Sequence, residues 1–125
     1  MATPLDSERY ISLETFRKDG SGVKTPVWAA PLDGKLVVFT DGTSFKVKRL
    51  RNNPKVRVAG CDVRGQTIKT EWHDGQARIV EGDTSYIERA HRALRDKYGW
   101  QLRMLDFFSR LGGRIGRRAY LELSI

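Results

Sequence analysis

The chain has 125 residues, with 23 lysines and arginines against 15 acidic residues and a net charge of +8. This length fits one domain over residues 1–125, and 39% hydrophobic against 30% charged residues is typical of a globular protein. The sequence has no membrane-length apolar run and no signal-like start, which predicts a cytoplasmic protein. Cys61 is its single cysteine, so no intramolecular disulfide can form. The positive charge favours an anionic partner.

The first forty residues predict three strands of a meander. Residues 9–17 are rich in β-forming residues and end at an Asp-Gly turn. A second run, 23–30, is followed by the turn Asp33-Gly34 and then by the short apolar run 35–40, which is typical of a strand buried on both faces.

The pattern then changes to a short helix and returns to strands. Ser44 is placed to cap a helix over residues 45–52. Alternation of apolar and polar residues predicts a fourth strand over 56–61, and residues 66–80 predict a long fifth strand. Gly75 inside that strand indicates a bulge or a bend.

Two helices and a closing strand complete the chain. Residues 85–88 match a capping box, and apolar residues at helical spacing follow as far as Gly99, which is placed to end the helix. Residues 100–111 predict another helix, and alternation over 118–125 predicts the last strand. Six antiparallel strands with short helices at the corners indicate a mainly β fold, a closed or half-closed barrel.

The start of the short helix is the segment that carries chemistry. Cations are disfavoured in the first turn of a helix, because its unpaired N–H groups give it a partial positive charge. Lys46 nevertheless lies in the first turn, with Lys48 and Arg49 just behind it. A phosphate would resolve this conflict by accepting hydrogen bonds from backbone N–H groups and the Ser44 hydroxyl. The alternative is that these cations form a solvated basic face on a basic protein. The residues alone favour neither the phosphate site nor the solvated face.

Nothing in the sequence predicts a metal site or a catalytic side chain. His73, His91 and Cys61 lie far apart and lack the spacing of zinc ligands. We interpret His73 as an exposed turn residue and the other two as packing residues. The sequence also shows no catalytic triad and no paired acid and base, so we assign no catalytic residue.

Four segments in order, residues 10–20, 25–28, 36–40 and 46–59, resemble the pyridoxamine 5′-phosphate oxidase-like split-barrel superfamily. Within it, the chain is most similar to the small deazaflavin-dependent oxidoreductases of actinobacteria. The resemblance covers nearly the whole chain. It implies a split, FMN-binding-like β-barrel that forms a homodimer with two cofactor sites at the subunit interface. Coenzyme F420 is the implied cofactor, with FMN as the alternative.

The resemblance also implies which residues bind the cofactor. The expected residues are Pro26, Val27 and Trp28 along the ring, Thr40, Ser44, Lys46, Lys48 and Arg49 at the phosphate, and Trp72 and Gln76 from the second subunit. For the anionic tail of F420, the candidates are Lys69, Arg78, Arg114, Arg117 and Arg118.

Together these features indicate an oxidoreductase that transfers a hydride between reduced F420, or FMN, and a small organic acceptor. A non-catalytic protein that binds a flavin, a deazaflavin or a tetrapyrrole on the same fold is one alternative. A small basic barrel that binds nucleic acid is another. The concentration of cations at one helix start and one loop, rather than along a strand face, argues against nucleic acid.

Overall fold

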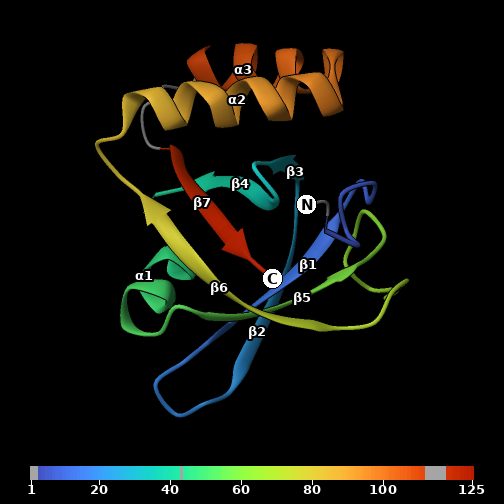
Figure 1. Ribbon diagram of the computed structural model, residues 1–125, viewed down its shortest axis with the longest axis vertical. Helices are drawn as coiled ribbons and strands as arrows, with labels where there is room; N and C mark the ends of the chain where they lie inside the picture. Colours follow the sequence, from blue (N-terminus) through green and yellow to red (C-terminus); the bar gives the residue numbers. More distant parts are fainter. Residues whose placement is uncertain (1–2, 43, 112–117) are drawn as a thin grey trace.

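The computed structural model describes residues 3–42, 44–111 and 118–125, with only the backbone for 108–111. A curled antiparallel sheet forms its body, and two helices cover one end of it (Figure 1). The strands are β1 (Ile11–Phe16), β2 (Gly22–Val27), β3 (Ala29–Leu32), β4 (Lys35–Asp41), β5 (Lys55–Gly60), β6 (His73–Val80) and β7 (Arg118–Ser124). Helix α1 (Phe45–Asn52) follows β4, and α2 (Thr84–Tyr98) and α3 (Trp100–Leu111) lie between β6 and β7.

The prediction of a mainly β barrel is confirmed, but its six strands are seven in the described part of the chain. The expected strand 23–30 is two strands, separated by Trp28. β2 pairs with β1 and β3 pairs with β4, and these pairs lie at opposite edges of the order β2-β1-β5-β6-β7-β4-β3. Because a single residue joins the two edges, the sheet must curl until its edges meet.

The predicted long strand 66–80 begins only at His73. Before it lies a loop in which the Asp62 carboxylate accepts hydrogen bonds from the backbone N–H of Gln66, at 2.8 Å, and of Thr67, at 3.3 Å. Such local bonds between a side chain and the backbone compete with strand pairing, which explains the late start of β6.

Two other local predictions are corrected. Gly75 marks no bulge, because the β5–β6 register runs through it without an inserted residue, and the alternative of a bend stays a prediction. Its missing Cβ instead leaves room for the Ser124 carbonyl oxygen, 2.5 Å from where that Cβ would lie. The cap of α2 is Asp83 rather than Ser85, and its carboxylate accepts from the Tyr86 N–H at 3.0 Å.

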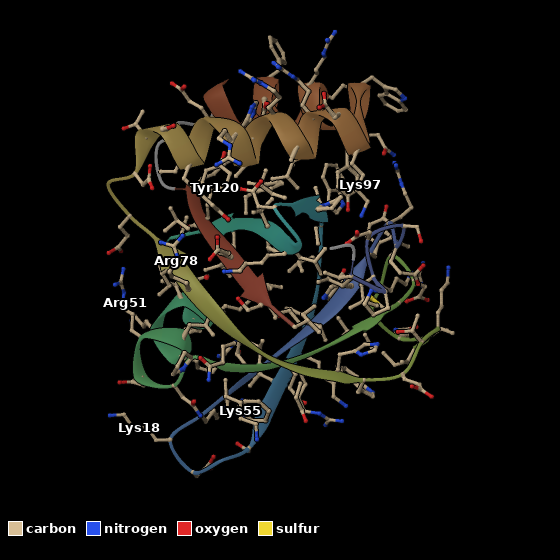
Figure 2. The ribbon with its side chains drawn as sticks, in the orientation of Figure 1. Lys18, Arg51, Lys55, Arg78, Lys97 and Tyr120 are labelled. Carbon is tan, nitrogen blue, oxygen red and sulfur yellow. The ribbon has the colours of Figure 1, made fainter. Side chains whose placement is uncertain are left out.

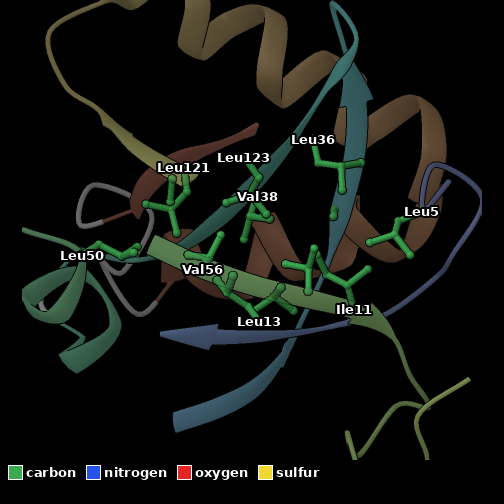
Figure 3. Packing of buried hydrophobic residues seen from close by; sticks show 13 residues of the cluster. Leu5, Ile11, Leu13, Leu36, Val38, Leu50, Val56, Leu121 and Leu123 are labelled. Atoms are coloured by element: carbon green, nitrogen blue, oxygen red, sulfur yellow. The ribbon is translucent and has the colours of Figure 1, made fainter. Parts of the chain in front are cut away.

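Two hydrophobic clusters hold this arrangement together. One fills the barrel and includes Leu13, Val38 and Leu121, all fully buried (Figure 3). The other lies between the sheet and α2, whose residues at four-residue spacing, Leu94 and Tyr98 among them, form one buried stripe. Burial of each large side chain contributes roughly 1.5–3 kcal/mol. In the described residues, no helix is long and apolar enough to cross a membrane.

Candidate functional site

The candidate site follows the seam, the line where the two edges of the sheet meet. Ala29 lies opposite Val38 in the β3–β4 pairing. Val27, two residues earlier, pairs with Ile11 of β1 instead, and Thr40, two residues after Val38, pairs with Ala119 of β7. β2 nevertheless contacts β4 across the seam. Because β2 is an edge strand, half of its backbone N–H and C=O groups face the seam rather than β1.

Three residues separate the end of β4 from the start of helix α1, so the first turn of α1 lies at the end of the seam. Ser44 is its N-cap as predicted, but the hydroxyl makes no capping hydrogen bond. Ser44 Oγ is buried and has no hydrogen-bond partner within the described residues. A buried hydroxyl of this kind is uncommon and calls for a partner that the protein itself does not supply.

Lys46 lies half-buried in the same turn, which contains no acidic residue among those described. Burial and then the nearby Arg49 guanidinium lower the pKa of the Lys46 ammonium, and Asp41 partly offsets this. The effect of Arg49 on Lys46 means that the two cations repel each other, in agreement with the prediction that they lie on one side of α1. An anion placed between them would remove the repulsion.

A basic pocket of about 240 Å³ opens between α1 and the end of β1. Its lining residues, none of them acidic, are Phe16, Arg17, Lys18, Phe45, Lys48, Arg49 and Asn52. The four from α1 follow one helix face at spacings of three and four residues. A second pocket of about 350 Å³ shares Phe16, Arg17, Lys18 and Asn52 with the first. Figure 2 shows Lys18 on the β1–β2 turn.

Arg49 is the best-positioned cation of this pocket. Its Nε donates to Thr15 Oγ1 at 2.6 Å, and Thr15 is fully buried in β1. Burial and then the neighbouring Arg17 lower the pKa of the Arg49 guanidinium. Lys48 Nζ instead lies 5.4 Å from the centroid of the Phe45 ring, another lining residue of the pocket.

Arg17 and Lys18 are site residues that the sequence analysis missed. They follow β1 and lie about thirty residues before the cations of α1. The signal that could have indicated them is two adjacent cations at a strand end, directly before a turn. Only the packing of α1 against β1 brings them into the same pocket.

The residues predicted to lie along the ring occupy the seam. Pro26 is exposed and Val27 is buried. Trp28 stacks on Tyr98, with ring centroids 4.4 Å apart and planes within 9°, so one face of the indole is covered by the protein. Next to them, Thr25 Oγ1 is another buried hydroxyl without a partner in the described part of the chain, as are Ser12 Oγ and Tyr86 Oη elsewhere.

Trp72 and Gln76 do not line the basic pocket of their own chain. Trp72 lies between two cations, 5.0 Å from Lys24 Nζ and 5.2 Å from the Arg57 guanidinium carbon. Gln76 is exposed on β6, opposite Lys55. Their contribution from a second subunit therefore stays a prediction.

The candidates for a tail site are dispersed. Arg78 and Arg118 each form an ion pair with a carboxylate, at 3.2 and 2.6 Å respectively. Lys69 is exposed on the loop before β6. Arg114 and Arg117 lie outside the described residues. Of the described candidates, Lys69, Arg78 and Arg118, none lines the basic pocket, where Arg17 and Lys18 lie instead.

The histidines and the cysteine show no catalytic arrangement. His73 is a half-buried residue of β6, so its prediction as an exposed turn residue is wrong. His91 Nε2 lies 2.8 Å from Asp106 Oδ2 and links α2 to α3. Burial raises the pKa of the Cys61 thiol, which is typical of a packing cysteine. Among the residues that the structure describes, no cluster of His, Cys, Asp and Glu could hold a metal ion.

Comparisons with known proteins agree with the fold. The family model described as pyridoxamine 5′-phosphate oxidase matches residues 1–125. The haem storage protein HutZ from Vibrio cholerae is 16% identical with a TM-score of 0.72, covering 94% of this chain and 81% of that one. A conserved hypothetical protein from Mycobacterium tuberculosis is 23% identical with a TM-score of 0.70, covering 94% and 73%.

A FAD-binding protein from Mesorhizobium loti is 22% identical with a TM-score of 0.65, covering 97% of this chain and 83% of that one. At such identities these likenesses show the fold alone. No curated protein matches the sequence.

Proposed function

The chain belongs to the pyridoxamine 5′-phosphate oxidase family, and from this membership we propose that it is a cytoplasmic oxidoreductase that binds a phosphate-bearing flavin or deazaflavin in the seam beside α1. Coenzyme F420 is the cofactor that we propose first, with FMN as the alternative. The observation that carries the proposal is the buried, unpartnered Ser44 hydroxyl at the start of α1, in the same helical turn as Lys46.

The start of α1 suits a phosphate group. The Ser44 hydroxyl and the backbone N–H groups of the first turn can donate to phosphate oxygens. Lys46 and Arg49 can neutralise the charge through charge-assisted hydrogen bonds, which are about twice as strong as neutral ones. Thr15 holds the Arg49 guanidinium in place through Nε, which leaves its other N–H groups for the ligand.

The seam suits the edge of a ring system. Val27 and Trp28 have backbone N–H groups and Pro26 has only a carbonyl, so this edge offers both donors and acceptors. The unpartnered Thr25 hydroxyl adds one more polar group at the same place. When bound, a flavin or deazaflavin supplies hydride transfer to or from a small organic acceptor, and the protein positions it.

The basic pocket supports F420 as the first choice. F420 carries an oligoglutamate tail beyond its phosphate, whereas FMN ends at the phosphate. Arg17 and Lys18 extend the cationic surface from α1 toward the β1–β2 turn and could face such a tail. We also propose a homodimer in which Trp72 and Gln76 of the second subunit complete the site, because neither basic pocket of one subunit is lined by the seam residues Pro26, Val27 and Trp28.

The proposal can be tested by titration with FMN, F420, FAD and the phosphate-free forms riboflavin and deazariboflavin, followed by absorbance and fluorescence. We expect the phosphate-bearing forms to bind more tightly than the phosphate-free ones. Substitution of Lys46 and Arg49 together by Gln removes two charge-assisted contacts and should reduce this difference by more than about tenfold. The matched control substitutes Arg92 and Arg103, exposed on α2 and α3, by Gln and should leave the difference unchanged.

The other outcomes assign different functions. Binding of haemin without binding of any flavin would contradict the proposal and favour a tetrapyrrole-binding protein. Cofactor binding without oxidation of the reduced cofactor by any acceptor would favour a carrier. Tight binding of single-stranded nucleic acid that falls steeply with salt would favour the basic-barrel alternative.

A further inference from the structure

Two side chains at the C-terminal end of α2 form hydrogen bonds with the backbone at the junction of β2 and β3. Lys97 Nζ donates to the carbonyl oxygen of Ala29 at 2.5 Å and to that of Glu8 at 2.6 Å. Tyr98 Oη accepts from the Ala29 N–H at 3.0 Å and donates to the Arg9 carbonyl at 2.7 Å. Both backbone groups of Ala29 are thus bonded to side chains of α2.

The side chain of Trp28 is fixed by the same helix. The Tyr98 ring stacks on the indole, and the Arg9 guanidinium lies 4.8 Å from the centroid of the Tyr98 ring. Phe39 meets the indole edge-on at 6.2 Å between centroids. The junction is therefore held through its backbone at Ala29 and through its side chain at Trp28.

Polar groups at this position are not needed for packing alone. Tyr98 is 3% exposed, and burial lowers the pKa of the half-buried Lys97 ammonium to about 8. Burying a phenol and an ammonium costs free energy unless hydrogen bonds offset it, so apolar side chains would fill the same space more easily. What the polar pair provides is a set of directed hydrogen bonds to the backbone of Ala29 and of the adjacent segment at Glu8 and Arg9. Figure 2 shows Lys97 beneath the end of α2, toward the strands.

We propose that Lys97 and Tyr98 are positioning residues for the ring-binding edge of β2. This inference rests on the proposed function, in which Pro26, Val27 and Trp28 face the ring. Tyr98 holds the Trp28–Ala29 peptide through its N–H, and Lys97 holds the next peptide through the Ala29 carbonyl. The position of the Trp28–Ala29 peptide sets where the last N–H and C=O groups of that edge point. Hydrogen bonds to a rigid ring tolerate little misalignment, so a shift of this peptide lowers ring affinity.

The test compares two substitutions with a phosphate-side variant. Lys97→Met removes the bonds to the carbonyls, and Tyr98→Phe removes the acceptor of the Ala29 N–H. In each we expect the affinities for FMN and riboflavin to fall together by about fivefold, the effect of losing one hydrogen bond. Their ratio stays at the wild-type value, and the visible absorption band of the bound flavin shifts. In Lys46→Gln we expect the opposite pattern: the ratio of FMN affinity to riboflavin affinity falls, while riboflavin affinity stays unchanged. Lys97→Arg should retain more ring affinity than Lys97→Met.

A measurement without cofactor keeps the test independent of enzyme loading. Amide hydrogen exchange at Ala29 should accelerate in Tyr98→Phe, while exchange in the centre of β1 stays slow and shows that the fold is intact. Wild-type ring affinity and spectrum in folded Lys97→Met and Tyr98→Phe would overturn this inference and leave the proposed function standing. A wild-type protein that binds no flavin or deazaflavin would overturn both.

Discussion

Arg49 on α1 and Thr15 on β1 are joined by a hydrogen bond of 2.6 Å from Nε to Oγ1, although 34 residues separate them. Thr15 is fully buried, so the hydroxyl has no access to water when this bond is lost. The bond both fastens α1 to the barrel and orients a cation of the basic pocket. One substitution should therefore affect stability and ligand affinity together.

Thr15→Val preserves the shape of the side chain and removes the acceptor. We expect the free energy of unfolding to fall by about 1 kcal/mol and the affinity for FMN to fall more than that for riboflavin. Urea unfolding and flavin titration measure the two effects. Thr67→Val, on an exposed loop, is the control and should change neither. Equal losses of FMN and riboflavin affinity in Thr15→Val would contradict a role of Arg49 at the phosphate.

Lys18→Gln tests whether the outer part of the basic pocket distinguishes F420 from FMN. Because this lysine is exposed and lies on the turn beyond β1, it should contact a tail rather than the phosphate. We expect F420 affinity to fall by about twofold to fivefold, in the range of an exposed ion pair, and FMN affinity to stay constant. Lys69→Gln removes the same charge elsewhere. A loss of F420 affinity in Lys69→Gln instead would place the tail at the loop before β6.

The elements that sequence analysis predicted well depend on short-range chemistry. The apolar spacing of α1 and the positive-φ residue Gly99 at the end of α2 are properties of a few neighbouring residues. The break at Trp28 was missed because the chain stays extended there and only changes its pairing partner. The pairing partners, β1 for β2 and β4 for β3, are fixed only in the folded sheet, and no local pattern records the change between them.

The site divides in the same way. Ser44, Lys46 and Arg49 could be predicted because cations in the first turn of a helix conflict with a local electrostatic rule. Arg17 and Lys18 could not, since they belong to the site only through the packing of α1 on β1. The missing hydrogen-bond partner of Ser44 is likewise visible only in three dimensions.

Glu122 should make the stability of the protein depend on acid pH. Its carboxylate lies 3.2 Å from Arg78 Nε and 3.4 Å from Lys35 Nζ. The Arg78 hydrogen bond, opposed by burial, lowers the pKa of Glu122 from 4.5 to about 2. A carboxyl group with a lowered folded-state pKa stabilises the fold above the unfolded-state pKa and loses this contribution as pH falls. The window therefore extends from about pH 4.5 down to about pH 2.

Glu122→Gln should flatten the pH dependence of stability in that window. Urea unfolding of the wild type and the variant at several pH values between 2 and 7 measures the slopes. Glu71→Gln, an exposed carboxylate, serves as the control and should keep the wild-type slope. Identical slopes for the wild type and Glu122→Gln would show that other carboxylates dominate the acid transition.

Gly75→Ala and Gly60→Ala form a matched pair that tests why glycine stands in β6. At Gly75 the new Cβ would meet the Ser124 carbonyl oxygen of the neighbouring backbone at 2.5 Å, and this atom cannot move without shifting β7. At Gly60, in β5, the new Cβ would meet only the end of the Glu8 side chain, which can rotate away. We expect Gly75→Ala to lower the free energy of unfolding by about 1–3 kcal/mol, as overpacking does, and Gly60→Ala to cost less. Urea unfolding of the two variants measures the loss of free energy of unfolding in each. A larger loss in Gly60→Ala would mean that β7 shifts more easily than the Glu8 side chain rotates.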